Sequence, residues 1–150
     1  KKGKCVDVHA VFVALARSAG IPAREVFGIR MPACPEGDIT GSHHCRAEFY
    51  LRGYGWVPVD PSDVLKLIVR EKLTLDDPAV KKARNYFFGA QNENYIDFGT
   101  GRDLILNPSQ EAERLNYFMY PYAEVDGKPL GSLSSGGELN YSITFKEVSK

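Results

Sequence analysis

Three residue types that can support nucleophilic chemistry occur at suggestive places in the chain. Cys5 begins a segment with helical periodicity, and the N–H groups and partial positive charge at a helix N-terminus stabilise a thiolate. His44 opens a predicted strand, and Asp60 ends the strand that follows it. Near the open end of an antiparallel hairpin an imidazole and a carboxylate can hydrogen-bond, which leaves the second ring nitrogen to face a thiol. Together the three residues predict a nucleophile, a base and an orienting acid.

Each of these residues has a simpler explanation when it is taken alone. A single cysteine is most often a small buried apolar residue, which is the favoured interpretation of Cys5 by itself. His44 alone fits a histidine at a loop edge, and Asp60 fits a turn residue before Pro61. Only the combination favours catalysis.

A zinc site is the second chemical reading of the same region. Cys34, His43, His44 and Cys45, with Cys5, are candidate ligands, but the close C-x-x-C pairing common in structural zinc sites is absent from the sequence. Adjacent residues on a strand point to opposite faces, so His44 and Cys45 are poorly placed to share one ion. We therefore predict His44 as a base, Cys45 packed into a sheet and His43 on a loop, with no metal and no cofactor.

The elements that must position these residues follow from periodicity and turn signals. Apolar residues recur at helical spacing over residues 5–19 and stop at Gly20. Residues 23–31 are predicted as a strand, and residues 32–42 as a loop. Residues 45–51 and 56–59 then form an antiparallel hairpin across a turn, and a short helix follows from residue 62.

The second half of the chain is predicted to be mostly strands after a helix over residues 77–88. The expected strands form a meander that closes the sheet, with a turn at Asp126-Gly127 and a loop at residues 131–137; these strands are 95–98, 103–106, 115–124 and 139–148. Three side chains receive structural interpretations: His9 as a helix-surface histidine, and Tyr54 and Trp56 as packing for the hairpin.

Length and composition narrow the class of protein. The 150 residues suit one domain, 1–150, with a sizeable core. Net charge is zero, with 19 basic and 19 acidic residues, which argues against nucleic acid as a partner. No apolar stretch reaches the roughly 20 residues of a membrane span. Three cysteines argue against a disulfide framework. The abrupt opening KKGK suggests a fragment that lacks upstream segments.

Two longer motifs carry a family resemblance. The run GKCVDVHAVFVALARSAGIPAR, followed by HCRAEFYLRGYGWVPVDPSD, resembles the transglutaminase-like superfamily over about residues 3–63. The segments YFFG (86–89) and NYFMYPYAEVDGKPL (116–130) are similar to bacterial transglutaminase-like domain proteins. The resemblance implies an α+β fold with a transglutaminase/papain-like core, in which an N-terminal helix bearing the cysteine packs on an antiparallel sheet. It also implies a papain-like triad of Cys5, His44 and Asp60.

The activity implied by this resemblance is acyl transfer or hydrolysis on protein or peptide amides, through a thioester on Cys5. Arg46 departs from the family, which commonly has an aromatic residue there, and predicts a more polar wall. The backbone N–H of the nucleophile is one implied oxyanion donor. A second, side-chain donor from upstream of the cysteine would be missing, so either it is supplied within these residues or the fragment is incomplete. The alternative is a catalytically inactive scaffold that binds proteins or peptides.

Overall fold

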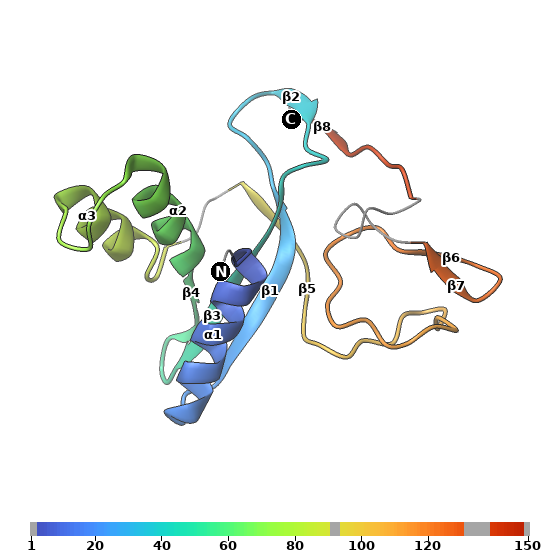
Figure 1. The fold of residues 1–150 in the computed structure, drawn as a ribbon, viewed down its shortest axis with the longest axis horizontal. Helices are drawn as coiled ribbons and strands as arrows, with labels where there is room; N and C mark the ends of the chain where they lie inside the picture. Colours follow the sequence, from blue (N-terminus) through green and yellow to red (C-terminus); the bar gives the residue numbers. More distant parts are fainter. Residues whose placement is uncertain (1–2, 91–93, 131–138, 149–150) are drawn as a thin grey trace. The chain divides into compact units, whose positions relative to one another are not determined.

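The computed structural model describes residues 3–90, 94–130 and 139–148 (Figure 1). The chain forms two compact units, Lys1–Val26 with Cys45–Glu93 and Phe27–His44 with Asn94–Lys150. Strands β1 (Ala23–Arg30) and β3 (His43–Leu51) each contribute residues to both units. With β4 (Gly55–Val59) and β5 (Tyr95–Thr100) they form a sheet of order β4-β3-β1-β5.

Helix α1 (Cys5–Ser18) opens the first unit and confirms the helix predicted over residues 5–19. The Asp7 carboxylate accepts a hydrogen bond from the Lys4 backbone N–H at 2.7 Å, which closes the first turn. Gly20, just past the helix, has a φ of 77°, a conformation that glycine adopts without steric cost. The start of α1 therefore places Cys5 at a helix N-terminus, as the pattern predicts.

Strands β3 and β4 form the predicted antiparallel hairpin. Their register pairs Ala47 with Val59 and Leu51 with Gly55. Gly53 in the turn between them and Gly55 at the start of β4 have φ values of 87° and 91°, which residues with side chains rarely adopt. Strand β4 ends at Val59, so Asp60 is the first residue after the hairpin.

Helix α1 packs on the sheet through a small apolar core. Four buried residues from α1, β1, β3 and β4 form this core, and three partly buried ones cover it: Val13, Ala23, Ala47 and Val59, with Phe12, Ala16 and Phe49. Residues 45, 47 and 49 alternate along β3, so the face of β3 that carries Ala47 is the face against α1. The predicted α+β architecture, with the N-terminal helix on an antiparallel sheet, is confirmed.

Two further helices complete the first unit. Helix α2 (Pro61–Glu71) begins close to the predicted position, and α3 (Pro78–Tyr86) ends two residues before the predicted boundary. Both have proline in the first turn, where the missing N–H costs nothing. Helix α2 contacts both α1 and α3.

The predicted meander in the second half is wrong. Strand β5 confirms the strand expected at residues 95–98, but the later strands are short and pair in two separate sheets. Strand β2 (Glu36–Asp38), inside the segment predicted as a loop, pairs with β8 (Thr144–Lys146). Strand β6 (Ala123–Val125) pairs with β7 (Lys128–Leu130) across the predicted Asp126-Gly127 turn.

Side-chain packing replaces strand pairing in much of this region. Residues 103–106 contribute only an isolated bridge from Leu104 to Leu115. Tyr117 stacks on Phe27 with ring centroids 5.2 Å apart, within a stretch predicted as strand. Apolar alternation indicates which residues are buried, but a strand also needs a partner edge. The loop predicted at residues 131–137 lies outside the described residues.

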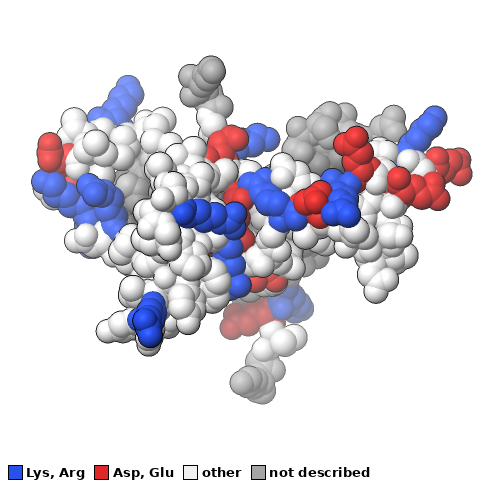
Figure 2. Space-filling model, turned by 90° about the horizontal axis from the view of Figure 1, so that it is seen from below, with Lys and Arg blue, Asp and Glu red and all other residues white. Residues whose placement is uncertain are grey.

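Charged side chains of both signs are interspersed on the face seen in Figure 2. This mixture agrees with the balanced composition of 19 basic and 19 acidic residues. Among the described residues, no helix is long and apolar enough to cross a membrane.

Candidate functional site

Cys5 is the first residue of α1, and its side chain is partly buried. Its thiol hydrogen-bonds to the thiol of Cys45 on β3. None of the three cysteines, all of which lie in the described residues, forms a disulfide. The structure therefore places a second sulfur directly beside the candidate nucleophile.

Cys45 is fully buried, which confirms that it packs into the sheet. The hydrogen bond with Cys5, burial, and the nearby negative charges of Cys5, Glu25 and Asp60 all raise the pKa of the Cys45 thiol far above its usual range. Cys45 consequently stays protonated at neutral pH. A thiolate in this pair resides on Cys5, which has the helix N-terminus to stabilise it.

This raised pKa predicts a loss of stability at high pH. Below the unfolded-state pKa of about 8.5, folded and unfolded chains both keep the Cys45 proton. Above it the unfolded chain releases the proton and the folded chain does not, so the free energy of unfolding falls by up to about 1.4 kcal/mol per pH unit. Urea unfolding at a series of pH values measures this slope. Cys45→Ala should flatten it and Cys34→Ala should not; equal slopes in the parent and Cys45→Ala would contradict the prediction.

His9 joins the thiols to Asp60. It is fully buried in α1, so the interpretation as a helix-surface histidine is wrong. Its Nδ1 lies 3.2 Å from the Cys45 sulfur and its Nε2 lies 3.2 Å from Asp60 Oδ1. The available signal was its position four residues after Cys5, which puts both on one helix face. The partners on β3 and after β4 could not be read from that spacing.

The four side chains form one hydrogen-bonded cluster with two proton arrangements. An ionised carboxylate only accepts, so His9 Nε2 donates to Asp60. In a neutral ring, Nδ1 then accepts from the Cys45 thiol; in an imidazolium, Nδ1 donates to the Cys45 sulfur. In the second arrangement Cys45 donates to a Cys5 thiolate. The cluster can therefore accommodate a negative Cys5 while Cys45 remains a thiol.

Asp60 is the N-cap of α2 and is buried. Besides His9, its Oδ1 accepts from the Ser62 hydroxyl at 2.9 Å and from the Asp63 backbone N–H at 3.1 Å. The interpretation as a simple turn residue before Pro61 is therefore incomplete, because the carboxylate also holds a helix end and a buried imidazole. Of the predicted site residues, Cys5 and Asp60 belong to the same cluster.

His44 and His43 belong to the second unit. His44 is buried at the start of β3, and its carbonyl accepts a hydrogen bond from the Tyr95 hydroxyl at 2.6 Å. His43 is the first residue of β3 rather than a loop residue, which corrects the prediction. Its ring packs against Tyr120 and Tyr141, with centroids 4.8 and 6.0 Å away. Burial lowers the pKa of His43, which keeps this ring neutral at pH 7.

The charged residues on β3 are compensated. Arg46 is buried with its guanidinium 3.7 Å from a Glu48 oxygen, so its charge is balanced by a neighbouring carboxylate. Glu48 also pairs with Arg24 at 2.9 Å. Arg24 stacks 4.1 Å above the ring of Trp56, which confirms Trp56 as a packing residue of the hairpin. Tyr54 is 84% exposed, so its predicted packing role is wrong.

Cys34, the remaining candidate ligand of the rejected zinc interpretation, is exposed before β2. Its thiol donates to the Glu36 carbonyl at 3.5 Å. Cys45, by contrast, is engaged with Cys5 and His9. These contacts give both thiols partners within the protein.

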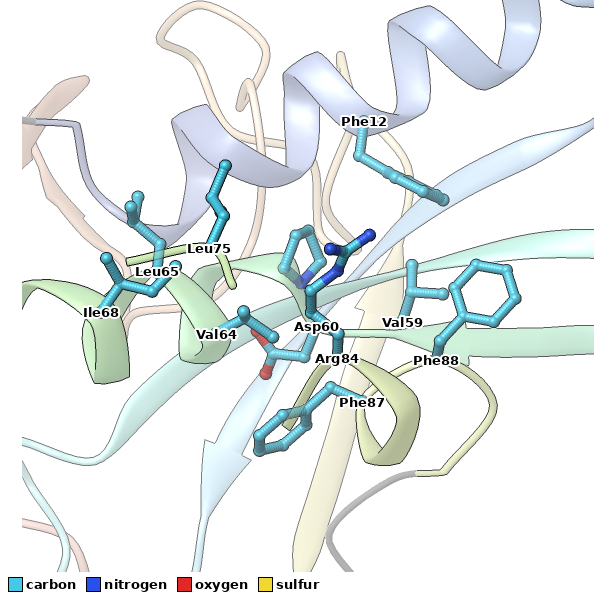
Figure 3. A pocket seen from close by; sticks show the side chains of 11 residues that line it. Phe12, Val59, Asp60, Val64, Leu65, Ile68, Leu75, Arg84, Phe87 and Phe88 are labelled. Atoms are coloured by element: carbon cyan, nitrogen blue, oxygen red, sulfur yellow. The ribbon is translucent and has the colours of Figure 1, made fainter. Parts of the chain in front are cut away.

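A cavity of about 310 Å³ lies beside Asp60, between α1, α2 and α3 (Figure 3). Its walls are largely apolar, from Phe12 on α1 to Phe87 and Phe88 after α3. The Arg84 side chain points toward Phe12 in Figure 3 and brings one positive charge to this wall. A cavity with these walls fits an aliphatic or aromatic group.

Comparison with known proteins agrees with the resemblance. Residues 1–61 match the model of the transglutaminase-like superfamily. This matched segment includes Cys5, His44 and Asp60, and members of that superfamily are generally cysteine enzymes.

The chain is also similar to an uncharacterized protein of Haemophilus influenzae (strain ATCC 51907 / DSM 11121 / KW20 / Rd). The two are 43% identical over 164 aligned residues, which cover 98% of this chain and 44% of that protein. The chain thus spans less than half the length of this relative. No solved structure matches the chain.

Proposed function

We propose that the protein catalyses acyl transfer or hydrolysis on protein or peptide amides through a thioester on Cys5. The supporting observation is the buried cluster at the start of α1, which joins the Cys5 thiol to Asp60 through Cys45 and His9. The superfamily match over residues 1–61 supports the same chemistry. The single domain predicted over residues 1–150 remains part of this proposal.

Each proposed step assigns a proton. His44 accepts the Cys5 proton, and the thiolate attacks the amide carbonyl carbon. The carbon–nitrogen bond breaks as His44 returns the proton to the leaving amine. An amine or water then attacks the thioester, regenerates the Cys5 thiol and gives a new amide or an acid. Asp60 orients the imidazole in this scheme, and the Cys5 backbone N–H at the helix start is the proposed oxyanion donor.

The rate of iodoacetamide alkylation at Cys5 against pH tests the activated thiol. An activated Cys5 should react well below the unperturbed thiol pKa of about 8.5 and should lose this advantage in His44→Ala. Peptide mass spectrometry follows Cys5, Cys34 and Cys45 separately in the same sample.

His43→Phe is the matched control, because it removes the neighbouring imidazole and keeps a ring between Tyr120 and Tyr141. Its alkylation profile should equal that of the parent. If Cys5 does not react with iodoacetamide, or reacts identically in His44→Ala, the assignment of a catalytic triad is rejected. The protein is then better described as an inactive scaffold that binds proteins or peptides.

A further inference from the structure

The contact between Cys5 and Cys45 is also suited to thiol oxidation, a reaction separate from acyl transfer. The two thiols come from different elements, α1 and β3, and are hydrogen-bonded to each other. Cys5 is partly accessible, whereas Cys45 is fully buried behind it. A small oxidant therefore reacts with Cys5 first. The Cys45 sulfur then lies next to the oxidised Cys5.

The His9 ring is positioned to activate that second sulfur. With Nε2–H directed at Asp60, the Nδ1 lone pair of a neutral ring faces the Cys45 thiol at 3.2 Å. Removing the thiol proton generates the nucleophile needed to attack an oxidised Cys5. A base held by a buried carboxylate counteracts the environment that otherwise keeps Cys45 protonated.

We propose that Cys5 and Cys45 form a reversible intramolecular disulfide when the protein meets a peroxide, with Cys45 as the resolving thiol and His9 as its base. The Cys5 thiolate attacks the peroxide O–O bond and becomes a sulfenic acid, while the other oxygen leaves as hydroxide. Cys45 transfers its proton to His9 and attacks the Cys5 sulfur. The sulfur–oxygen bond breaks and hydroxide leaves as water after protonation.

The electrons and atoms balance in this sequence. Two thiols are oxidised to one disulfide, and one hydrogen peroxide is reduced to two waters. A thiol reductant reverses the reaction and restores both cysteines. Cys5 lies in the first turn of α1. The end of a helix shifts more easily than its middle, so Cys5 can approach Cys45 closely enough for the disulfide to form.

The test treats the parent protein with hydrogen peroxide and maps its cysteines by non-reducing peptide mass spectrometry. The expected product is a Cys5–Cys45 linked peptide that has lost two hydrogens and disappears with dithiothreitol, while Cys34 stays outside the link. Cys34→Ala should give the same product. Cys45→Ala should give none and should accumulate sulfinic acid at Cys5 instead.

The rate of the second step tests His9. His9→Gln should slow conversion of the sulfenic acid to the disulfide by about 10²-fold, whereas the first oxidation step should persist. Direct passage of Cys5 to sulfinic acid in the parent, or a link between Cys34 and another molecule as the main product, would overturn the proposal. The readout is covalent mass, so it stands or fails independently of acyl transfer.

Discussion

Replacing His44 with alanine is expected to slow acylation of Cys5 by 10²- to 10⁴-fold, roughly the range that a positioned general base contributes. The reason is that the neutral Cys5 thiol is a poor nucleophile and the proposed base removes its proton. p-Nitrophenyl acetate is a suitable probe because its activated ester reports acylation without a known natural substrate. The burst of p-nitrophenolate gives the rate, and peptide mass spectrometry identifies the acetylated cysteine.

Two variants serve as controls for this measurement. Cys5→Ala should abolish the burst, and His43→Phe should leave it at the parent rate because His43 packs against tyrosines in the second unit. A His44→Ala protein that acylates at the parent rate would remove His44 from the mechanism. His9, linked to Cys5 through Cys45, would then be the imidazole to investigate as the base.

Replacing Asp60 with alanine is expected to lower the free energy of unfolding by roughly 2–4 kcal/mol, the sum of a lost helix cap and a buried donor left without its acceptor. The carboxylate caps α2 through the Asp63 N–H and also accepts from His9 and Ser62, all on one oxygen. Urea unfolding followed by circular dichroism measures the loss.

The Asp60→Asn variant distinguishes the contribution of Asp60 to stability from its contribution to acylation. Asparagine is as good an N-cap as aspartate and keeps an acceptor oxygen, so Asp60→Asn should retain most of the stability. Its neutral side chain should still slow acylation, because it stabilises an imidazolium less well. Asp77→Ala, at the exposed start of α3, should cost less stability than Asp60→Ala. Equal losses in Asp60→Ala and Asp77→Ala would show that the buried contacts of Asp60 contribute little.

Local patterns were enough to predict the elements that hold the candidate site. Helical spacing ended by Gly20 predicted α1, and the turn residues around Gly53 predicted the β3–β4 hairpin. These predictions succeeded because each depends on residues close together in the chain. The transglutaminase-like motifs identified Cys5, His44 and Asp60 as candidate residues for the same reason, since each motif is a short continuous run.

Predictions that depended on distant partners were weaker. Alternating residues between 103 and 124 predicted strands, but the structure has short strands in separate sheets and aromatic contacts such as Phe27 with Tyr117. Alternation describes burial on one face and does not say which edge will pair. The prediction of a strand meander is therefore wrong, although the predicted turn at Asp126-Gly127 is confirmed.

The sequence by itself determined that a cysteine begins the first helix, that an antiparallel hairpin follows, and that an aspartate stands at its end. Only the tertiary structure decided that His9 is buried between Cys45 and Asp60, and that Cys45 lies against Cys5. His9 has polar neighbours 36 and 51 residues away, beyond the reach of any local period. Burial made those contacts consequential, because a buried imidazole, thiol and carboxylate must satisfy one another where water does not.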